Sequence, residues 1–222
     1  MKAIMAITAA LAIVLACGSD DPSGPSAGGD DAAYYPLAVG NSWDYSRAGT
    51  MDTSGVQMGT VSGSAQISIT GTDTHSGGFN VFVQETHVSD TTFIAGISVV
   101  SDSTFTDYVR VTDDGFFGYP RLTDTDSSWT VPFPIQQGHS WNFAEEPPTT
   151  GEILSTSVTV VVPAGTFEDC MEMRTIWMDS GLTVTNTADF ARNVGQVRNV
   201  FNSTMDNMSI TVTNSLESYT LY

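Results

Sequence analysis

The chain has 222 residues and is 41% hydrophobic, so it can bury one good core, as a single domain or as two small halves that share it. Its 7 basic and 25 acidic residues give a formal charge of -18. Such an acidic surface repels phosphate backbones and anionic headgroups, which argues against nucleic-acid binding and electrostatic membrane binding. The charge is typical of a solvated surface that keeps a β-rich protein soluble, although it would also attract cationic partners.

Residues 1–16 combine one basic residue, Lys2, with an unbroken run of apolar and small residues from Ala3 to Ala16. This pattern predicts a secretory signal peptide, because the run is too short for a transmembrane helix. The segment ends in Val14-Leu15-Ala16-Cys17, which resembles a bacterial lipobox. We therefore expect lipidation of Cys17. The alternative is an ordinary signal peptide that is cleaved nearby.

Residues 17–33 begin with the lipidated cysteine and continue as an acidic stretch with no apolar residue larger than alanine or proline. We expect a flexible spacer that enters no core and reaches roughly 20–25 Å. Acylation would make the protein membrane-anchored in the bacterial cell envelope. Gly18, in place of aspartate after Cys17, favours the outer membrane if the source is Gram-negative.

The sequence pattern of residues 34–222 predicts an all-β domain. Apolar residues alternate with polar ones in segments such as Ala65–Ile69 and Phe79–Gln84, and no segment has helical periodicity. The clearest hairpin pairs Tyr108–Thr112 with Phe116–Tyr119 around Asp113-Asp114-Gly115, since Asp-Gly suits a tight turn. Further strands are expected in the following segments: 152–162, 170–178, 182–190, 196–201 and 209–222.

One motif occurs twice. Pro36–Tyr45 and Pro134–Phe143 both read proline, aliphatic, two variable residues, glycine, one variable residue, Ser-Trp, one variable residue, aromatic. Each copy predicts a turn followed by a strand that places the tryptophan and the aromatic residue on one face. The repeat suggests two similar halves, 34–120 and 134–222, joined by the proline-rich segment 120–134. Convergence of two short turn sequences is the alternative.

The ten to twelve expected strands have short connections, which favours a curved antiparallel meander that forms a half-barrel or a sandwich. Parts of the chain also resemble a loose group of uncharacterised bacterial lipoproteins and secreted β-rich domains. The resemblance rests on the opening Gly-Asn-Ser-Trp signature, on Val160–Cys170 with its Val-Pro-Ala-Gly-Thr-Phe-x-x-Cys pattern, and on Phe190–Val197. It implies a β-rich envelope protein and no known activity.

Cys170 is the only cysteine besides Cys17, and we interpret it as a small residue packed in a strand. Strict alternation would place it on the more polar face, opposite Met171 and Met173. The three histidines, His75, His87 and His139, have no metal-binding or catalytic spacing. Therefore no catalytic, cofactor-binding or metal-binding residue is predicted.

Two aspartate-rich turns, Asp113–Gly115 and Thr123–Ser128, supply oxygen ligands of the kind that Ca²⁺ prefers, but both lack the pattern of an EF-hand loop. Solvated turns are the simpler interpretation. The four tryptophans, Trp43, Trp129, Trp141 and Trp177, either fill the core or line a groove for a sugar or an acyl chain.

The leading hypothesis is a membrane-anchored, non-catalytic binding or interaction module of the bacterial envelope, with a lipid, another small hydrophobe or an envelope protein as its partner. One alternative is a structural or adhesive surface domain, and a secreted hydrolase is a third. An open concavity lined by valine, isoleucine, methionine and phenylalanine would favour the binding module. An interior filled by the chain's own aromatic residues would favour the structural domain.

Overall fold

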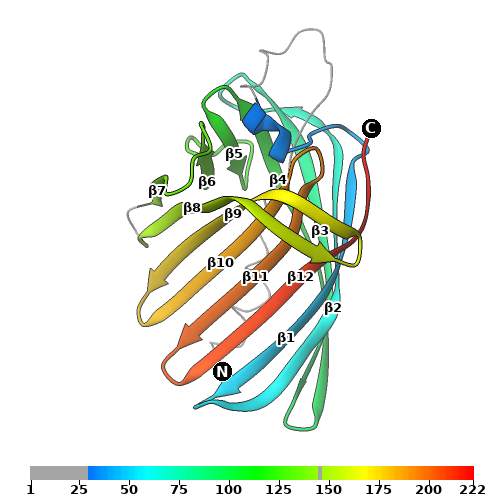
Figure 1. Cartoon of the computed structure of the whole chain (residues 1–222), viewed down its shortest axis with the longest axis vertical. Helices are drawn as coiled ribbons and strands as arrows, with labels where there is room; N and C mark the ends of the chain where they lie inside the picture. Colours follow the sequence, from blue (N-terminus) through cyan, green and yellow to red (C-terminus); the bar gives the residue numbers. More distant parts are fainter. Residues whose placement is uncertain (1–29, 145–146) are drawn as a thin grey trace.

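The computed structural model describes residues 30–144 and 147–222, so the expected signal peptide and Cys17 lie outside the described residues. Within them, twelve antiparallel strands form one sheet that curls into a nearly closed barrel, which confirms the predicted fold class (Figure 1). A short 3-10 helix, η2 (Asp30–Tyr34), comes first. The first six strands are β1 (Ser42–Thr53), β2 (Val56–Thr74), β3 (Asn80–Ile94), β4 (Ile97–Thr112), β5 (Gly115–Tyr119) and β6 (Trp129–Pro132). The other six are β7 (Ser140–Ala144), β8 (Thr149–Val162), β9 (Gly165–Asp179), β10 (Leu182–Ala191), β11 (Gly195–Met205) and β12 (Met208–Thr220).

The sheet order is β6-β5-β4-β3-β2-β1-β12-β11-β10-β9-β8-β7. Neighbours in the chain are therefore neighbours in the sheet, and the β1–β12 ladder joins the two six-strand meanders. The two edge strands, β6 and β7, meet at a seam. There the Trp141 indole Nε1 donates a hydrogen bond to the Thr130 carbonyl oxygen at 2.7 Å. A side chain thus links the two edges of the sheet.

The two motif copies begin β1 and β7 with the same local structure. The Gly40 N–H donates to the Ile69 carbonyl, and the Gly138 N–H donates to the Ile153 carbonyl, each at 2.8 Å. Both glycines have positive φ, 101° and 81°, a conformation that favours glycine. Trp43 then begins a central strand and is fully buried, whereas its counterpart Trp141 begins an edge strand and is partly exposed.

One end of the barrel is filled by aromatic side chains, and we call it the closed end. The residues after η2 pack into it, where the Tyr35 ring stacks on Phe116 with centroids 4.8 Å apart and lies 5.3 Å from the Phe190 centroid. The Asp31 carboxylate accepts a hydrogen bond from the Ile135 N–H at 2.9 Å. The last residues of the expected spacer, 30–33, therefore belong to this packed helix, and Ala32 is buried.

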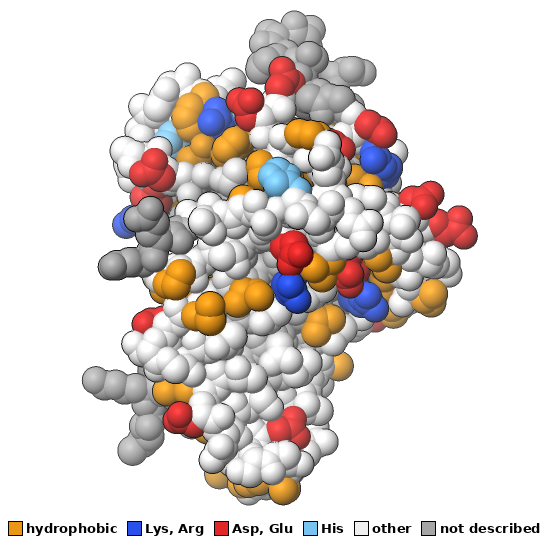
Figure 2. Space-filling model, turned by 60° about the vertical axis from the view of Figure 1, so that its left-hand side comes forward, with side chains coloured by type: hydrophobic (Ala, Val, Ile, Leu, Met, Phe, Trp, Pro, Cys, Tyr) orange, Lys and Arg blue, Asp and Glu red, His pale blue; other side chains and the backbone are white. Residues whose placement is uncertain are grey.

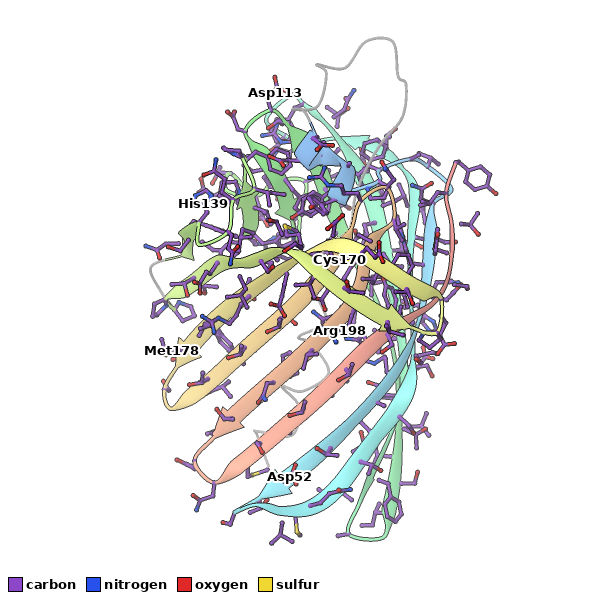
Figure 3. All side chains as sticks on the ribbon, in the orientation of Figure 1. Asp52, Asp113, His139, Cys170, Met178 and Arg198 are labelled. Atoms are coloured by element: carbon purple, nitrogen blue, oxygen red, sulfur yellow. The ribbon has the colours of Figure 1, made fainter. Side chains whose placement is uncertain are left out.

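The opposite end, which we call the open end, is formed by the hairpins β1–β2, β3–β4, β9–β10 and β11–β12 (Figure 1). Most of the large hydrophobic side chains exposed in the described residues lie on these hairpins: Val56, Met58, Phe93, Ile97, Val99, Val100, Met178, Met205 and Met208. Figure 2 shows hydrophobic side chains at the lower tip of the molecule, and Figure 3 places Asp52 there and Asp113 at the other end. The barrel therefore presents apolar side chains at its open end.

The tip of the β8–β9 hairpin lies across β11 and β12 (Figure 1). The Ala164 N–H donates to the Leu216 carbonyl at 2.9 Å, and several register shifts interrupt the β8–β9 ladder. Asp169 has a positive φ of 50°, which breaks the alternation of side chains in β9. Cys170 and Met171 are consequently both fully buried, so the expectation that Cys170 lies on a polar face is wrong.

The predicted hairpin around Asp113 is confirmed, because Val111 pairs with Phe116 and Thr112 with Gly115. The segment 120–134 differs from the predicted connection, since it contains the short strand β6. Trp129 to Pro132 pair there with β5. The sequence did not predict this strand because the segment contains three prolines. One of them, Pro132, is the last residue of β6.

Candidate ligand-binding site in the barrel lumen

The concave face of the barrel, which lines its lumen, carries two apolar regions. The larger one fills the closed end and includes Trp43, Tyr45, Ala65 and Leu216. The smaller one lies toward the open end and consists of Met51, Val61, Ile210 and Val212, with Ile94 packed against it. We call this smaller region the lower apolar wall.

A row of polar side chains crosses the concave face between the two regions, and we call it the polar belt. Its members are Asp90 on β3, Arg47 on β1, Asn214 on β12, Asn199 on β11 and Asn186 on β10. Arg47 pairs in register with Asn214, and Asn214 with Asn199, while Asn186 lies diagonally beyond. The belt thus runs over six adjacent strands.

Arg47 and Asp90 form the charged end of the polar belt. The Arg47 Nε and Nη2 donate to the two Asp90 carboxylate oxygens at 2.8 and 2.9 Å. Both side chains are buried, with exposed fractions of 8% and 9%. The strand β2 lies between them, and its residue in this row is Gly63. A Cβ at Gly63 would collide with the Ser89 carbonyl and the Asp90 carboxylate, so glycine is what allows the pair to meet.

The remaining contacts continue across β12, β11 and β10. The Arg47 Nη1 donates to the Asn214 Oδ1 at 2.6 Å, and the Asn214 Nδ2 lies 3.0 Å from the Asn199 Oδ1. The Asn199 Nδ2 in turn lies 2.6 Å from the Asn186 Oδ1. Among the described residues, the Asn186 Nδ2 has no hydrogen-bond partner. Asn186 is therefore the belt asparagine whose amide nitrogen has no partner in the described residues, whereas the amide nitrogens of Asn214 and Asn199 each donate once.

Asn186 is also one of the residues lining a pocket of about 200 Å³, which we call the lumen pocket. Its walls come from the strands β6 to β11 and from the residue before β6: Ser128, Trp129, Val131, Phe143, Thr149, Met173, Thr175, Val184, Asn186 and Phe201. The lining is mainly apolar, with a few hydroxyl groups and one amide. Phe201 pairs with Val212 of the lower apolar wall, so the pocket and the wall are adjacent.

Asp107 on β4 is a second buried acid on the concave face, opposite Gln84 of β3. Burial raises the pKa of its carboxyl group to about 6. Within residues 30–144 and 147–222, no arginine or histidine forms an ion pair with it. The lumen therefore contains one acidic group whose charge is not compensated by a cation.

Of the residues singled out in the sequence, Trp129, Ser128, Phe143 and Met173 line the lumen pocket, whereas the cysteine and the histidines lie outside it. Cys170 is packed in the core, and burial raises the pKa of its thiol to about 11, which disfavours the reactive thiolate (Figure 3). His75 is buried and stacks on Phe79, and His87 contacts the Asp102 carboxylate at 3.0 Å on an exposed surface. His139 lies against Trp141.

The aspartate-rich turns are spread over the surface. Asp124 pairs with Arg121 at 2.9 Å, and Asp113 and Asp114 are exposed. No group of three or more potential metal-ligating side chains occurs in the described part of the chain. In the same residues, no helix is long and apolar enough to cross a membrane.

The polar belt was missed by sequence analysis, although one signal was present. Arg47 follows Trp43 and Tyr45 at steps of two, so alternation alone places it on the buried face. A buried arginine needs a partner. The partners lie 43 and 167 residues away in the chain, and only the strand register identifies them.

No protein-family model matches the chain, and no curated protein matches it in sequence. Among solved structures, it is similar to a β-barrel-like protein of domain of unknown function DUF1849 from Brucella abortus, with 10% identity and a TM-score of 0.42, over 83% of this chain and 98% of that one. A "putative exported protein" with a YmcC-like fold from Bacteroides fragilis has 13% identity and a TM-score of 0.39, over 83% and 97%. A "putative lipoprotein" from Parabacteroides distasonis has 16% identity and a TM-score of 0.37, over 84% and 98%.

Proposed function

We propose that the protein is a non-catalytic binding module of the bacterial envelope, anchored through lipidated Cys17, that holds an apolar ligand in its barrel lumen. The observation that carries this proposal is the contrast along the concave face. Aromatic residues fill the closed end, whereas the lumen pocket and the lower apolar wall lead to exposed apolar side chains at the open end.

The size and lining of the pocket support a ligand that is only partly enclosed. Sites that bury a whole drug-sized molecule have about 300–1,000 Å³, and the lumen pocket has about 200 Å³. One end of the ligand therefore fits between Val184 and Phe201, and the remainder extends past the lower apolar wall toward the exposed apolar side chains of the open end. Apolar contact of this kind supplies binding free energy without a catalytic group.

A hydrolase would need a histidine close to a serine or a carboxylate inside a cleft. His87 meets the Asp102 carboxylate, but both side chains are about half exposed or more, on the opposite face of the sheet from the lumen. This placement favours the binding module. A structural or adhesive domain remains the alternative, because the aromatic packing of the closed end would serve it equally well.

The test measures binding of a fluorescent hydrophobic probe, N-phenyl-1-naphthylamine, to the full chain carrying Cys17→Ser. This substitution ensures that no acyl chain on the protein competes for the lumen. We expect saturable binding, and we expect Val184→Trp, which fills the lumen pocket, to weaken it at least tenfold. The matched control is Thr185→Trp, because Thr185 is the next residue of β10 and points to the other face.

Unchanged probe binding in Val184→Trp would contradict a site in the lumen pocket. No saturable binding to the parent chain would contradict the proposed function as a whole. Circular dichroism of both tryptophan variants checks that the sheet is retained.

A further inference from the structure

We propose that the ligand is an uncharged amphiphile whose hydrogen-bond acceptor, a carbonyl or ester oxygen, is bound by the Asn186 Nδ2 while its apolar chain extends toward the open end. This inference rests on the proposed function and adds the chemical class of the ligand. It follows from the direction of the hydrogen bonds in the polar belt and from the charges around the lumen.

The direction of the polar belt is fixed by Arg47. A guanidinium group only donates hydrogen bonds, so the Asn214 atom that faces it at 2.6 Å must be the oxygen. The Asn214 amide nitrogen then faces Asn199, whose nitrogen faces Asn186. Each side-chain amide therefore accepts on the Arg47 side and donates on the other side.

The last donor in this sequence belongs to Asn186, which lines the lumen pocket. Its Oδ1 is used by Asn199, and in the described residues its Nδ2 has no partner. Hydrogen bonds in a chain polarise one another, so the free N–H group is a better donor than that of an isolated amide. The best-matched ligand group at this position is therefore a hydrogen-bond acceptor, because the Oδ1 already has one partner and the Nδ2 has none in the described residues.

The charges around the lumen argue against an anionic acceptor. Arg47 is the only arginine on the concave face in the described residues, and the Asp90 carboxylate compensates its charge. The other five arginines of the described residues lie outside the lumen. Three of them form ion pairs: Arg198 with Asp189, Arg174 with Glu152 and Arg192 with Asp30. Arg110 lies over the Phe79 ring, and Arg121 pairs with Asp124. A carboxylate or phosphate in the pocket would find no uncompensated cation, and the Asp107 carboxyl group lies on the same concave face.

A cationic group fits poorly as well, because it would face the Asn186 donor, and the Asp107 carboxyl group that could attract it is not among the residues lining the lumen pocket. The pocket hydroxyl groups of Ser128, Thr149 and Thr175 can either donate or accept, so they do not change this preference. An uncharged carbonyl or ester is the group that satisfies the free donor without bringing a charge into the lumen.

The experiment compares four ligands with the same chain length in the probe-displacement assay at about pH 8: methyl dodecanoate, dodecanoate, dodecylammonium and dodecane. At this pH the carboxylate and the ammonium are both charged. One added hydrogen bond corresponds to about a 3- to 10-fold gain in affinity. We expect methyl dodecanoate to bind tighter than dodecane by this factor, and tighter than either charged ligand.

The deciding variant is Asn186→Asp, which keeps an acceptor for Asn199 but removes the free donor. We expect it to abolish the advantage of the ester, so that the ratio of the ester affinity to the dodecane affinity, measured in the same variant, falls to about one. Asn186→Leu, which has a similar shape and no polar atoms, should give the same result. The matched control is Asn202→Asp on β11, because Asn202 lies on the opposite face from Asn199.

Two results would overturn the inference and leave the proposed function intact. The ester could keep its advantage in Asn186→Asp, or one of the charged ligands could bind as tightly as the ester. Failure of all four ligands, dodecane included, would instead contradict the proposed function and the inference together.

Discussion

Long strands such as β1 and β12 run through both ends of the barrel, but the two ends have different interiors. At the closed end, Tyr35, Trp43, Phe116 and Phe190 are all less than 2% exposed and fill the space with their own rings. At the open end, Ile97 and Val99 of β4 lie on the concave face and are 62% and 54% exposed. The closed end should therefore supply most of the stability, because its side chains pack against one another. The open end should supply binding, because its apolar side chains remain exposed.

The largest difference in the free energy of unfolding should come from Trp43 and Trp141, the tryptophans of the two motif copies. Trp43→Ala removes a fully buried ring and its 2.6 Å hydrogen bond to the Val194 carbonyl, so we expect a loss of about 3–5 kcal/mol in the free energy of unfolding. Trp141→Ala should cost about 1–2 kcal/mol, because its ring is only partly buried. Urea denaturation followed by circular dichroism measures both. Equal losses would contradict the assignment of the main core to the closed end.

The next largest effect concerns the polar belt between the two ends. Arg47→Met leaves the Asp90 carboxylate buried without its cation, so we expect a loss of about 3 kcal/mol or more. The double variant Arg47→Met with Asp90→Leu should recover most of that loss, because no unpaired charge remains. Denaturation of the two variants tests this. A double variant as unstable as the single one would show that the pair does more than compensate its own charges.

The third effect is a pH dependence in the lumen. The folded-state pKa of Asp107, about 6, lies above its usual value of 3.8, so the folded protein binds this proton more tightly than the unfolded chain does. This group therefore makes the protein less stable as the pH rises from about 4 to about 6. Asp107→Asn should raise the free energy of unfolding by about 2–3 kcal/mol at pH ~8 and leave it nearly unchanged at pH ~4.

Denaturation curves of wild type and Asp107→Asn at the two pH values give this difference directly. Asp102→Asn is the matched control, because Asp102 is on the same strand and exposed. A similar effect of both substitutions would contradict the burial of Asp107.

The smallest effect on stability should come from the open end. Val99→Ser changes a side chain that is more than half exposed, so we expect less than about 0.5 kcal/mol. Probe binding should nevertheless weaken, because Val99 lies on the concave face. Val100→Ser, one residue further along β4 and on the other face, is the control. If both variants bind the probe like wild type, the ligand does not extend to this end.

Much of the architecture could be predicted from local patterns. Alternation and turn residues indicated the strands, and the repeated motif indicated the similar starts of β1 and β7. The ends of strands and the irregularities within them were harder to predict from the sequence. The bulge at Asp169 reversed the face expected for Cys170, and β6 was hidden by prolines, because both depend on which strand lies alongside.

The candidate site was much harder to predict than the fold. Asn186, Asn199 and Asn214 are ordinary residues in a chain rich in polar side chains, Arg47 is one of six arginines, and none of the four belongs to a motif. They meet only because the register of six strands aligns them and because Gly63 leaves room for Arg47 to reach Asp90. Long-range register of this kind has no local sequence signal.

The central claim is that the lumen holds a ligand, and native mass spectrometry tests it most directly. The full chain with Cys17→Ser would be purified from a bacterial envelope, alongside Val184→Trp and Thr185→Trp. We predict a bound hydrophobic mass on the parent and on Thr185→Trp that is absent from Val184→Trp. An apo mass for the parent, unchanged after incubation with envelope lipid extract, would contradict the account and favour a structural or adhesive role.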